Sequence, residues 1–399
     1  MSQAPDGVAF LDPGATSFLA DPHPTFDRLR DQNSVVRDPI GWSVLSYTAC
    51  DAAFHDRALI PGIDPLLEQR GVGALWGKPG HTLTDSEGVD HQRLRRVVSP
   101  WFTPKRIEQL RERVRVTVDA VLADVEPGVD FDVMAELADI IPSRLFCWMM
   151  GVPDGDAPAL ARLSKVLLTV FTATSDMVAP VRAAKAELAR YTRELLMWKR
   201  AVPGDDLASM LSAAEATGSL QEEDVFYLLE ELLSASVDNT ANTAGLCVWT
   251  LATHPPQWSM LHLQPDLLAN AVEECGRFQP AIRHTIKYAI DDTVIEGTTV
   301  AAGEFVTIRI AAAHRDPAVF DDPHRLDIER KPAKPQLAFG AGRHYCLGAA
   351  LGKMEVQEIV RGLVSRWPSC EPGEGVSMNL NGAGIVFALP VRLLTTGPT

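Results

Sequence analysis

The 399-residue sequence predicts a mainly α-helical protein with small β-sheets. Apolar residues recur every three or four positions through most of residues 103–252, which is the spacing of one face of an α-helix. Strand-like runs are short and few. No repeat, low-complexity tract or Gly/Ser-rich linker divides the chain, so we expect a single domain over residues 1–399.

The helices are expected where the apolar periodicity is strongest. These segments are Arg106–Val125, Pro142–Met150, Ala159–Phe171, Val181–Met197, the long stretch Glu222–Ala252, and 351–367. The segments with strand-like patterning are Trp42–Tyr47, Thr293–Ile295, Phe305–Ile310 and Gly384–Leu394. We therefore expect a helical body with small sheets at its edge.

Composition and charge exclude several classes of protein. Asp and Glu number 52 against 37 Lys and Arg, and the net charge of −15 disfavours binding to nucleic acid or to anionic membranes. Six scattered cysteines without a Cys-x-x-Cys pair indicate a reducing cytoplasm rather than a secreted disulfide framework. The first residues lack the pattern of a signal peptide and no apolar run reaches ~18 residues, so no membrane anchor is expected.

A polar stretch, Ser-Ala-Ser-Val-Asp-Asn-Thr-Ala-Asn-Thr at residues 234–243, interrupts the apolar pattern of the long helix. An acid and several hydroxyl groups inside a buried helix cost free energy unless they are paired, hydrated or face a cavity. Two interpretations stay open. The side chains bond back to the helix backbone, or the helix lines a reaction pocket in which Asp238 handles protons.

The second notable segment is Phe-Gly-Ala-Gly-Arg-His-Tyr-Cys-Leu-Gly at residues 339–348, followed by a helical pattern. Glycines around Cys346 permit close backbone approach and N–H groups aimed at the sulfur, and a following helix N-terminus favours a thiolate. This arrangement suits an axial thiolate ligand for a haem iron. A buried structural cysteine and a nucleophilic cysteine paired with a remote histidine are the alternatives.

The spacing Phe-Gly-x-Gly-x-His-x-Cys-x-Gly resembles the cysteine loop of the cytochrome P-450 family of haem-thiolate monooxygenases, in its soluble bacterial form. The resemblance covers essentially the whole chain. It implies a single-domain P-450 fold with haem b between the long central helix and the helix after the cysteine loop. It also implies Cys346 as the iron ligand and contacts to the cofactor from Phe339, Gly340, His344 and Gly348.

Two further segments match the family's haem-contacting positions. His91 and Arg95 match its His-x-x-x-Arg motif, and a spacing of four places both cations on one helix face, where they suit the haem propionates. A solvated helix face is the alternative. Lys287 stands where the family often has a propionate-binding arginine, and Arg283 is an off-register alternative to it.

Glu274 and Arg277 match the family's Glu-x-x-Arg motif, with Arg325 expected as the third partner. In the family this buried ion network clamps the segment that leads into the cysteine loop, so its role is structural. An exposed i, i+3 ion pair is the alternative and would contribute only about 0.3–0.5 kcal/mol.

The polar stretch departs from the family's oxygen-activation motif, [Ala/Gly]-Gly-x-[Asp/Glu]-Thr-Thr. Ser236 replaces the glycine, and Asn239 replaces the threonine whose hydroxyl bonds iron-bound oxygen. A carboxamide donates and accepts hydrogen bonds but does not readily pass on its own proton. We therefore expect Asp238 to be the proton-relay acid and Asn239 to orient a water or the substrate, with Ser236 or Thr240 assisting.

The resemblance implies insertion of oxygen from O2 into a small or medium hydrophobic substrate by a monomer, with electrons passing from NAD(P)H through ferredoxin reductase and ferredoxin. Basic residues that would attract an acidic ferredoxin, unless they are only scattered solvated charges, are Arg93, Arg96, Lys105, Arg106, Arg343 and Lys353. The substrate pocket would draw on Leu168, Phe171, Leu233, Val237, Ile282, Ile385 and, as a polar exception, His284. Ordinary core packing is the alternative for each apolar one.

Other activities remain open at this point. Asn239 leaves room for peroxide-driven or oxidative-coupling chemistry at the same haem. From a different class, a haem-binding sensor or carrier without turnover would carry the same cysteine loop. A cysteine hydrolase without haem is a third alternative.

Overall fold

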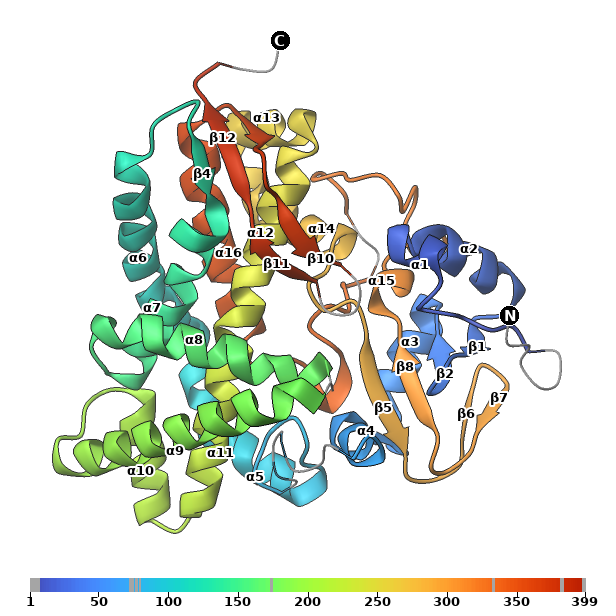
Figure 1. Cartoon of the computed structure of the whole chain (residues 1–399), viewed down its shortest axis with the longest axis horizontal. Coiled ribbons are helices and arrows are strands. Elements are labelled where there is room, and N and C mark those ends of the chain that lie inside the picture. Colours follow the sequence, from blue (N-terminus) through green and yellow to red (C-terminus); the bar gives the residue numbers. More distant parts are fainter. Residues whose placement is uncertain are drawn as a thin grey trace.

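The computed structural model describes residues 8–71, 75, 78, 80–172, 175–331, 334–380 and 384–396, without the side chains of residues 171, 172 and 175. It is mostly helical, with small sheets, which confirms the predicted fold class. In Figure 1 the helices form one side of the molecule, and the N-terminal segments and the strands β1, β2, β5 and β8 form the other.

The helices are α1 (Thr16–Ala20), α2 (His23–Gln32), α3 (Tyr47–His55), α4 (Ile63–Gln69), α5 (Gly88–Val98), α6 (Pro104–Val121), α7 (Ile140–Met150), α8 (Ala157–Leu168), α9 (Val178–Ala201), α10 (Leu207–Ala216), α11 (Glu222–Ser236), α12 (Asp238–Ala252), α13 (Pro255–Leu263), α14 (Leu268–Phe278), α15 (Ile310–Ala313) and α16 (Ala349–Arg366). A 3-10 turn at Gly342–His344 lies within the cysteine loop.

The strands are β1 (Val35–Arg37), β2 (Gly41–Val44), β3 (Leu59–Pro61), β4 (Asp130–Asp132), β5 (Thr285–Ala289), β6 (Thr293–Ile295), β7 (Thr298–Val300), β8 (Phe305–Ile308), β9 (Ser369–Pro372), β10 (Ser377–Asn379), β11 (Ile385–Ala388) and β12 (Pro390–Leu394). One sheet has the order β1-β2-β8-β5-β3, with β2 and β8 parallel. Smaller sheets pair β10 with β11, β4 and β9 with β12, and β6 with β7.

The predicted helices are present with shifted ends. The helix predicted at Arg106–Val125 is α6. It begins two residues earlier, at Pro104, because a proline at the first helical position loses no intrahelical hydrogen bond. The predicted helix Ala159–Phe171 is α8, which ends at Leu168 and continues as a 3-10 turn.

Three of the predicted strands are too long, and one of them, Phe305–Ile310, ends as β8 at Ile308. The run Trp42–Tyr47 is β2 only as far as Val44, because the Ser46 hydroxyl accepts a hydrogen bond from Ala49 N and caps α3. The run Gly384–Leu394 is divided into β11 and β12, which pair with different strands. The division occurs beside Pro390, which has no N–H for a ladder.

The predicted helix Glu222–Ala252 is wrong as one uninterrupted element. α11 ends at Ser236 and α12 begins at Asp238, while Val237 between them has a ψ of −65°. The Ser236 hydroxyl donates to Leu232 O at 2.6 Å, and such back-bonding to the preceding turn bends helices. In Figure 1 both helices follow one course through the middle of the helical side.

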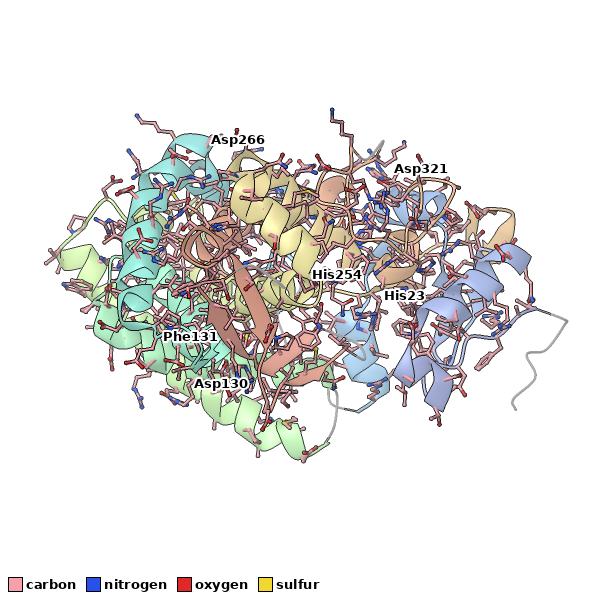
Figure 2. All side chains as sticks on the ribbon, turned by 90° about the horizontal axis from the view of Figure 1, so that it is seen from above. His23, Asp130, Phe131, His254, Asp266 and Asp321 are labelled. Carbon is pink, nitrogen blue, oxygen red and sulfur yellow. The ribbon has the colours of Figure 1, made fainter. Side chains whose placement is uncertain are left out.

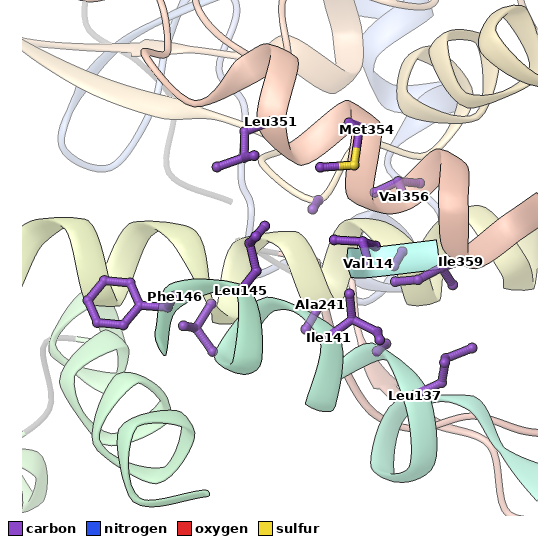
Figure 3. Packing of buried hydrophobic residues seen from close by; sticks show 14 of the residues in the cluster. Val114, Leu137, Ile141, Leu145, Phe146, Ala241, Leu351, Met354, Val356 and Ile359 are labelled. Carbon is purple, nitrogen blue, oxygen red and sulfur yellow. The ribbon is translucent and has the colours of Figure 1, made fainter. Parts of the chain in front are cut away.

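The largest apolar core surrounds this course. Ala241 of α12 is fully buried, with α7 on one side and α16 on the other. Figure 3 shows Ile141 of α7 close to Ala241, and Leu351 and Met354 of α16 across the helix. The central helix and the helix after Cys346 are therefore held against each other by packed side chains.

A separate, smaller core lies under the five-stranded sheet at the N-terminal side. In the view of Figure 2, Phe131 on β4 marks the helical side, and His23 on α2 marks the N-terminal side. Among the described residues, no helix has the length and apolar character needed to cross a membrane.

Candidate active site

Cys346 lies between the 3-10 turn at Gly342–His344 and the start of α16. Its N–H donates to Phe339 O at 2.9 Å, which closes the loop. Gly340 and Gly342 both have a φ of +68°, a conformation that favours glycine. A Cβ on Gly342 would also lie 2.8 Å from Phe54 O, so a larger residue would push this loop away from α3.

Cys346 is the exposed cysteine, whereas the other five are buried. The protein surrounding the sulfur raises the pKa of its thiol by desolvation. The N–H groups of Gly348 and Ala349, and the charges of Arg95 and Lys353, act in the opposite direction. A sulfur that is open to a ligand and faces N–H donors and cations fits a thiolate bound to a metal cation.

The cations beside this loop come from α5 and from the loop itself. His91 and Arg95 share one face of α5, and the rings of His91 and His344 are 4.5 Å apart. Arg95 Nη2 donates to Tyr345 O at 2.8 Å. His91 is buried, yet its Nε2 has no hydrogen-bond partner among the described residues. Burial, with His344 and Arg95, lowers the pKa of His91 to about 4.

One carboxylate, Glu87, faces these cations. It pairs with Arg343 Nε at 2.6 Å and with His344 Nε2 at 2.9 Å. These two partners hold the pKa of Glu87 at about 2, against the effect of burial. Sequence analysis missed Glu87, although it precedes His91 by one helical turn. Arg343, which was expected on the ferredoxin surface, has its guanidinium paired with Glu87 at the loop.

Lys287 and Arg283, the two candidate propionate ligands, have different charged neighbours. Lys287 on β5 is buried, and its pKa is lowered to about 8 by burial and by Arg343, with Glu87 acting in the opposite direction. Arg283 has Asp21 as its charged neighbour instead. The structure therefore brings Lys287, and not Arg283, to the cluster beside the cysteine loop.

A cavity of about 900 Å³ opens beside this cluster. Its lining includes Glu87, His91, Arg95, Arg343 and, further out, His55, Arg57, Arg96, Ile60 and Ile290. The cations outnumber the single carboxylate, and His91 retains a free ring nitrogen. These residues fit a group that carries carboxylates, as a haem does through its propionates.

The polar stretch faces the cysteine-loop helix across the core. A Cβ on Gly352 of α16 would lie 3.7 Å from Thr240 Oγ1. Asp238 Oδ2 accepts from Asn242 Nδ2 at 3.0 Å, and burial raises the pKa of Asp238. Asn239 Nδ2 donates to Ala235 O at 3.3 Å, so the amide bonds back to its own helix.

Several predicted pocket residues lie around this stretch. Leu233 and Val237 are buried in the main core, and Leu168 packs against it at the end of α8. Asn242 Oδ1 accepts from Val386 N at 2.7 Å, which ties α12 to the strand that carries Ile385. Gly384 N donates to Ala281 O at 2.6 Å, which brings the segment of Ile282 to the same strand.

The other two predicted pocket residues are His284 and Phe171. His284 lies beside the buried Arg309–Asp38 pair, and burial, with Arg309, lowers its pKa to about 3. The side chain of Phe171 lies outside the described residues.

The Glu274–Arg277 pair is buried and bidentate, with two N–O distances of 2.7 Å. The third partner is Arg330, whose Nε lies 3.0 Å from Glu274 Oε1, and the prediction of Arg325 is wrong. The side chain of Arg325 is 60% exposed and pairs with Asp322 and Asp327. Only its carbonyl joins the network, because the chain turns at this point and presents its backbone inward.

The network reaches the cysteine loop through His314. Arg277 Nη1 donates to His314 O at 2.8 Å, and His314 Nε2 accepts from Leu337 N at 2.7 Å, two residues before Phe339. Burial, with Arg277, lowers the pKa of His314 to about 3. The network therefore holds the backbone that enters the loop.

Comparison with known proteins agrees with this geometry. The profile of the cytochrome P450 family matches residues 74–392. The chain is a cytochrome P450. It is 34% identical to the P450 monooxygenase PikC of Streptomyces venezuelae, over 96% of this chain and 94% of that protein. It is 31% identical to luteothin monooxygenase of Streptomyces thioluteus, over 96% of both chains. The solved structure of CalO2 superposes with a TM-score of 0.90 at 28% identity, over 97% of this chain and 100% of that one.

Membership settles the enzyme class and the cofactor. The P450 is an oxidoreductase that uses haem b and O2, with electrons that come from NAD(P)H through redox partners. This excludes the two alternatives from other classes, a haem-binding sensor or carrier and a cysteine hydrolase without haem. The open thiol of Cys346 and the excess of cations beside the cysteine loop suit the iron and the carboxylates of this haem.

Proposed function

We propose that this P450 oxidises a small or medium hydrophobic substrate, with ferredoxin as the direct electron donor. The observation that carries the proposal is the half-buried Asp238 at the start of α12, two residues before Thr240, which lies close to Gly352 of α16. Bound haem supplies the iron that activates O2. The chain supplies a dry pocket, a thiolate and a proton-holding acid.

Asp238 is the residue to which we assign the proton relay. Burial raises its pKa, so it holds a proton more readily than an exposed aspartate. Lys165 and Asp139, which pair at 2.5 Å nearer the surface, influence its charge in opposite directions. We assign the path from solvent to Asp238 to this pair.

The test is the spectrum of the reduced protein under carbon monoxide, followed by turnover with a competent ferredoxin system. We expect a strongly red-shifted Soret band and product formation from hydrophobic substrates. Asp238→Asn should keep the spectrum and reduce product formation by about 100-fold, which is typical of the loss of a proton-transfer group. Unchanged turnover in this variant would contradict the assignment.

Asn239 favours a second candidate, a peroxide-driven or oxidative-coupling enzyme, because its amide bonds to Ala235 O and offers no hydroxyl for proton transfer. We expect Asn239→Thr to raise the product formed per NAD(P)H if the enzyme uses the ferredoxin route. Turnover with hydrogen peroxide that exceeds ferredoxin-driven turnover would favour the second candidate.

For ferredoxin docking we propose a smaller surface than the six basic residues named from the sequence. In addition to Arg343, three of the predicted residues form ion pairs: Arg93 with Asp224, Arg106 with Asp205 and Lys353 with Glu273. Arg96 and Lys105 are exposed and form no ion pair within the described part of the chain. We propose that these two cations, with Arg57 at the cavity, dock an acidic ferredoxin.

Replacing Arg96 and Lys105 together with glutamate should raise the KM for ferredoxin and reduce its salt dependence, with kcat retained at saturation. The matched control is Arg162→Glu on α8, which should leave the KM unchanged. Equal effects of both changes would contradict the docking assignment.

We also propose that the enzyme is a monomer, which light scattering of the purified protein tests.

A further inference from the structure

A group of charged side chains lies where α9 and α11 pack together, and Asp64 of α4 lies close enough for its charge to be affected. Lys185 Nζ on α9 pairs with Glu230 Oε1 on α11 at 2.6 Å, and the Glu230 side chain is only 6% exposed. Asp64 on α4 lies within the electrostatic reach of Lys185. One lysine therefore serves two carboxylates at this junction.

Each of these carboxylates has a free oxygen. Asp64 Oδ2 and Glu230 Oε2 are buried and have no hydrogen-bond partner among the described residues. Burial raises the pKa of Asp64 to about 6 and also raises the pKa of Glu230, while Lys185 acts against both changes. Unsatisfied buried acceptors are rare in folded proteins, so among the described residues these two oxygens can accept from a further donor.

The surroundings indicate what kind of cation fits. The same elements contribute buried apolar residues, namely Leu67, Val181, Ala184, Leu229 and Leu233. The Tyr227 ring lies 5.7 Å from Lys185 Nζ, and an aromatic face attracts cations. Within the described residues no group of three or more His, Cys, Asp or Glu side chains could hold a metal ion. An organic cation with an apolar body fits better than a metal.

Glu230 lies on the same helix course as Asp238. Glu230 precedes Asp238 by eight residues along the course of α11 and α12, which corresponds to about 12 Å at ~1.5 Å per residue. Leu233 and Val237, two of the predicted pocket residues, lie between them. A ligand anchored at Glu230 would extend its apolar body along these residues.

We propose that Asp64 and Glu230 bind the positively charged end of the substrate, so that the enzyme prefers apolar molecules bearing a protonated or quaternary amine. The proposal rests on the proposed function, because it assigns a recognition role to the wall of that pocket. The oxidised atom would then lie about 12 Å from the nitrogen along the helix course.

The test compares two probes on the haem-loaded enzyme, dodecyltrimethylammonium and neutral dodecanol. The quaternary nitrogen cannot ligate iron, so both probes report pocket binding through calorimetry and through the haem spin state. We expect the cation to bind at least about 10-fold more tightly, because it pairs with buried carboxylates. Glu230→Gln and Asp64→Asn should each remove most of this preference and leave dodecanol binding unchanged.

The matched control is Glu68→Gln, because Glu68 is an exposed acid on the same helix as Asp64. It should change the affinity for the cation by less than about 2-fold, as expected for an exposed charge. Asp64→Asn gives an independent result if Glu230→Gln lowers stability. Equal binding of both probes, or a preference that survives in both variants, would overturn the proposal.

The carbon monoxide spectrum of the same preparation separates this proposal from the proposed function. A red-shifted Soret band without any preference for the cation removes the amine site and leaves the monooxygenase. A preference for the cation in calorimetry without that band removes the monooxygenase assignment and leaves a cation site.

Discussion

Two charged clusters next to the cysteine loop are built differently. In the network around Glu274, both carboxylate oxygens are used by Arg277 and Arg330, and Arg277 also donates to three carbonyls. In the cluster of His91, Arg95, Arg343 and His344, one carboxylate faces several cations and a buried ring nitrogen stays free.

The difference shows which cluster is complete in the protein alone. A buried charge is tolerated when every donor and acceptor is matched, so the Glu274 network stabilises the chain and needs no ligand. The cluster around His91 has donors left over, so it is suited to bind an anion. Stability experiments should therefore respond to the first cluster, and cofactor experiments to the second.

The largest effect is expected at the ligand itself. Cys346→Ala should abolish the red-shifted Soret band and lower oxygen insertion by more than about 100-fold, because it removes the thiolate that holds and activates the iron. The spectrum and product analysis measure this. Cys370→Ala, a change at a buried cysteine on β9, should keep both signals.

A change in the network around Glu274 should alter the stability of the fold. Glu274→Gln leaves two buried guanidinium groups without their carboxylate, and we expect a loss of about 3–5 kcal/mol in the free energy of unfolding. Urea denaturation measures this loss. Arg325→Gln, at the exposed position that the family motif suggested, should cost less than about 0.5 kcal/mol. Similar losses in both variants would contradict the structural assignment of Arg330.

A change in the cluster around His91 should alter how tightly the protein retains its haem. Arg95→Met should speed haem dissociation by about 10–100-fold, because it removes a charge-assisted hydrogen-bond donor from the cofactor's carboxylates. Transfer of haem to an excess of apomyoglobin measures the rate. Arg190→Met, at an exposed position on α9 that does not line the cavity, is the control and should change the rate by less than about 2-fold.

The response to acid also separates the clusters. His314 stays neutral in the folded chain, with a pKa lowered from 6.5 to about 3. The unfolded chain takes up this proton first, so the stability that neutral His314 contributes is present above pH 6.5 and is lost as the pH falls towards 3. His314→Gln should make the unfolding free energy less dependent on pH over this range.

The family motifs were readable because they are local. Phe339 to Gly348 forms one loop, His91 and Arg95 lie one helical turn apart, and Glu274 and Arg277 share a helix. Helix periodicity similarly predicted most of the helical side. What failed were element ends and the break at Val237, where a cap, a proline or a side-chain hydroxyl competes with the pattern.

The sequence by itself determined the fold class, the cysteine loop and the residue types that surround it, because these depend on spacing along the chain. Only the tertiary structure decided which of several similar charges is buried and with whom. It selected Arg330 over Arg325, Lys287 over Arg283, and Glu87 as the carboxylate at the loop. These pairs join positions far apart in sequence, and their burial depends on how α5, α14 and the cysteine loop pack together.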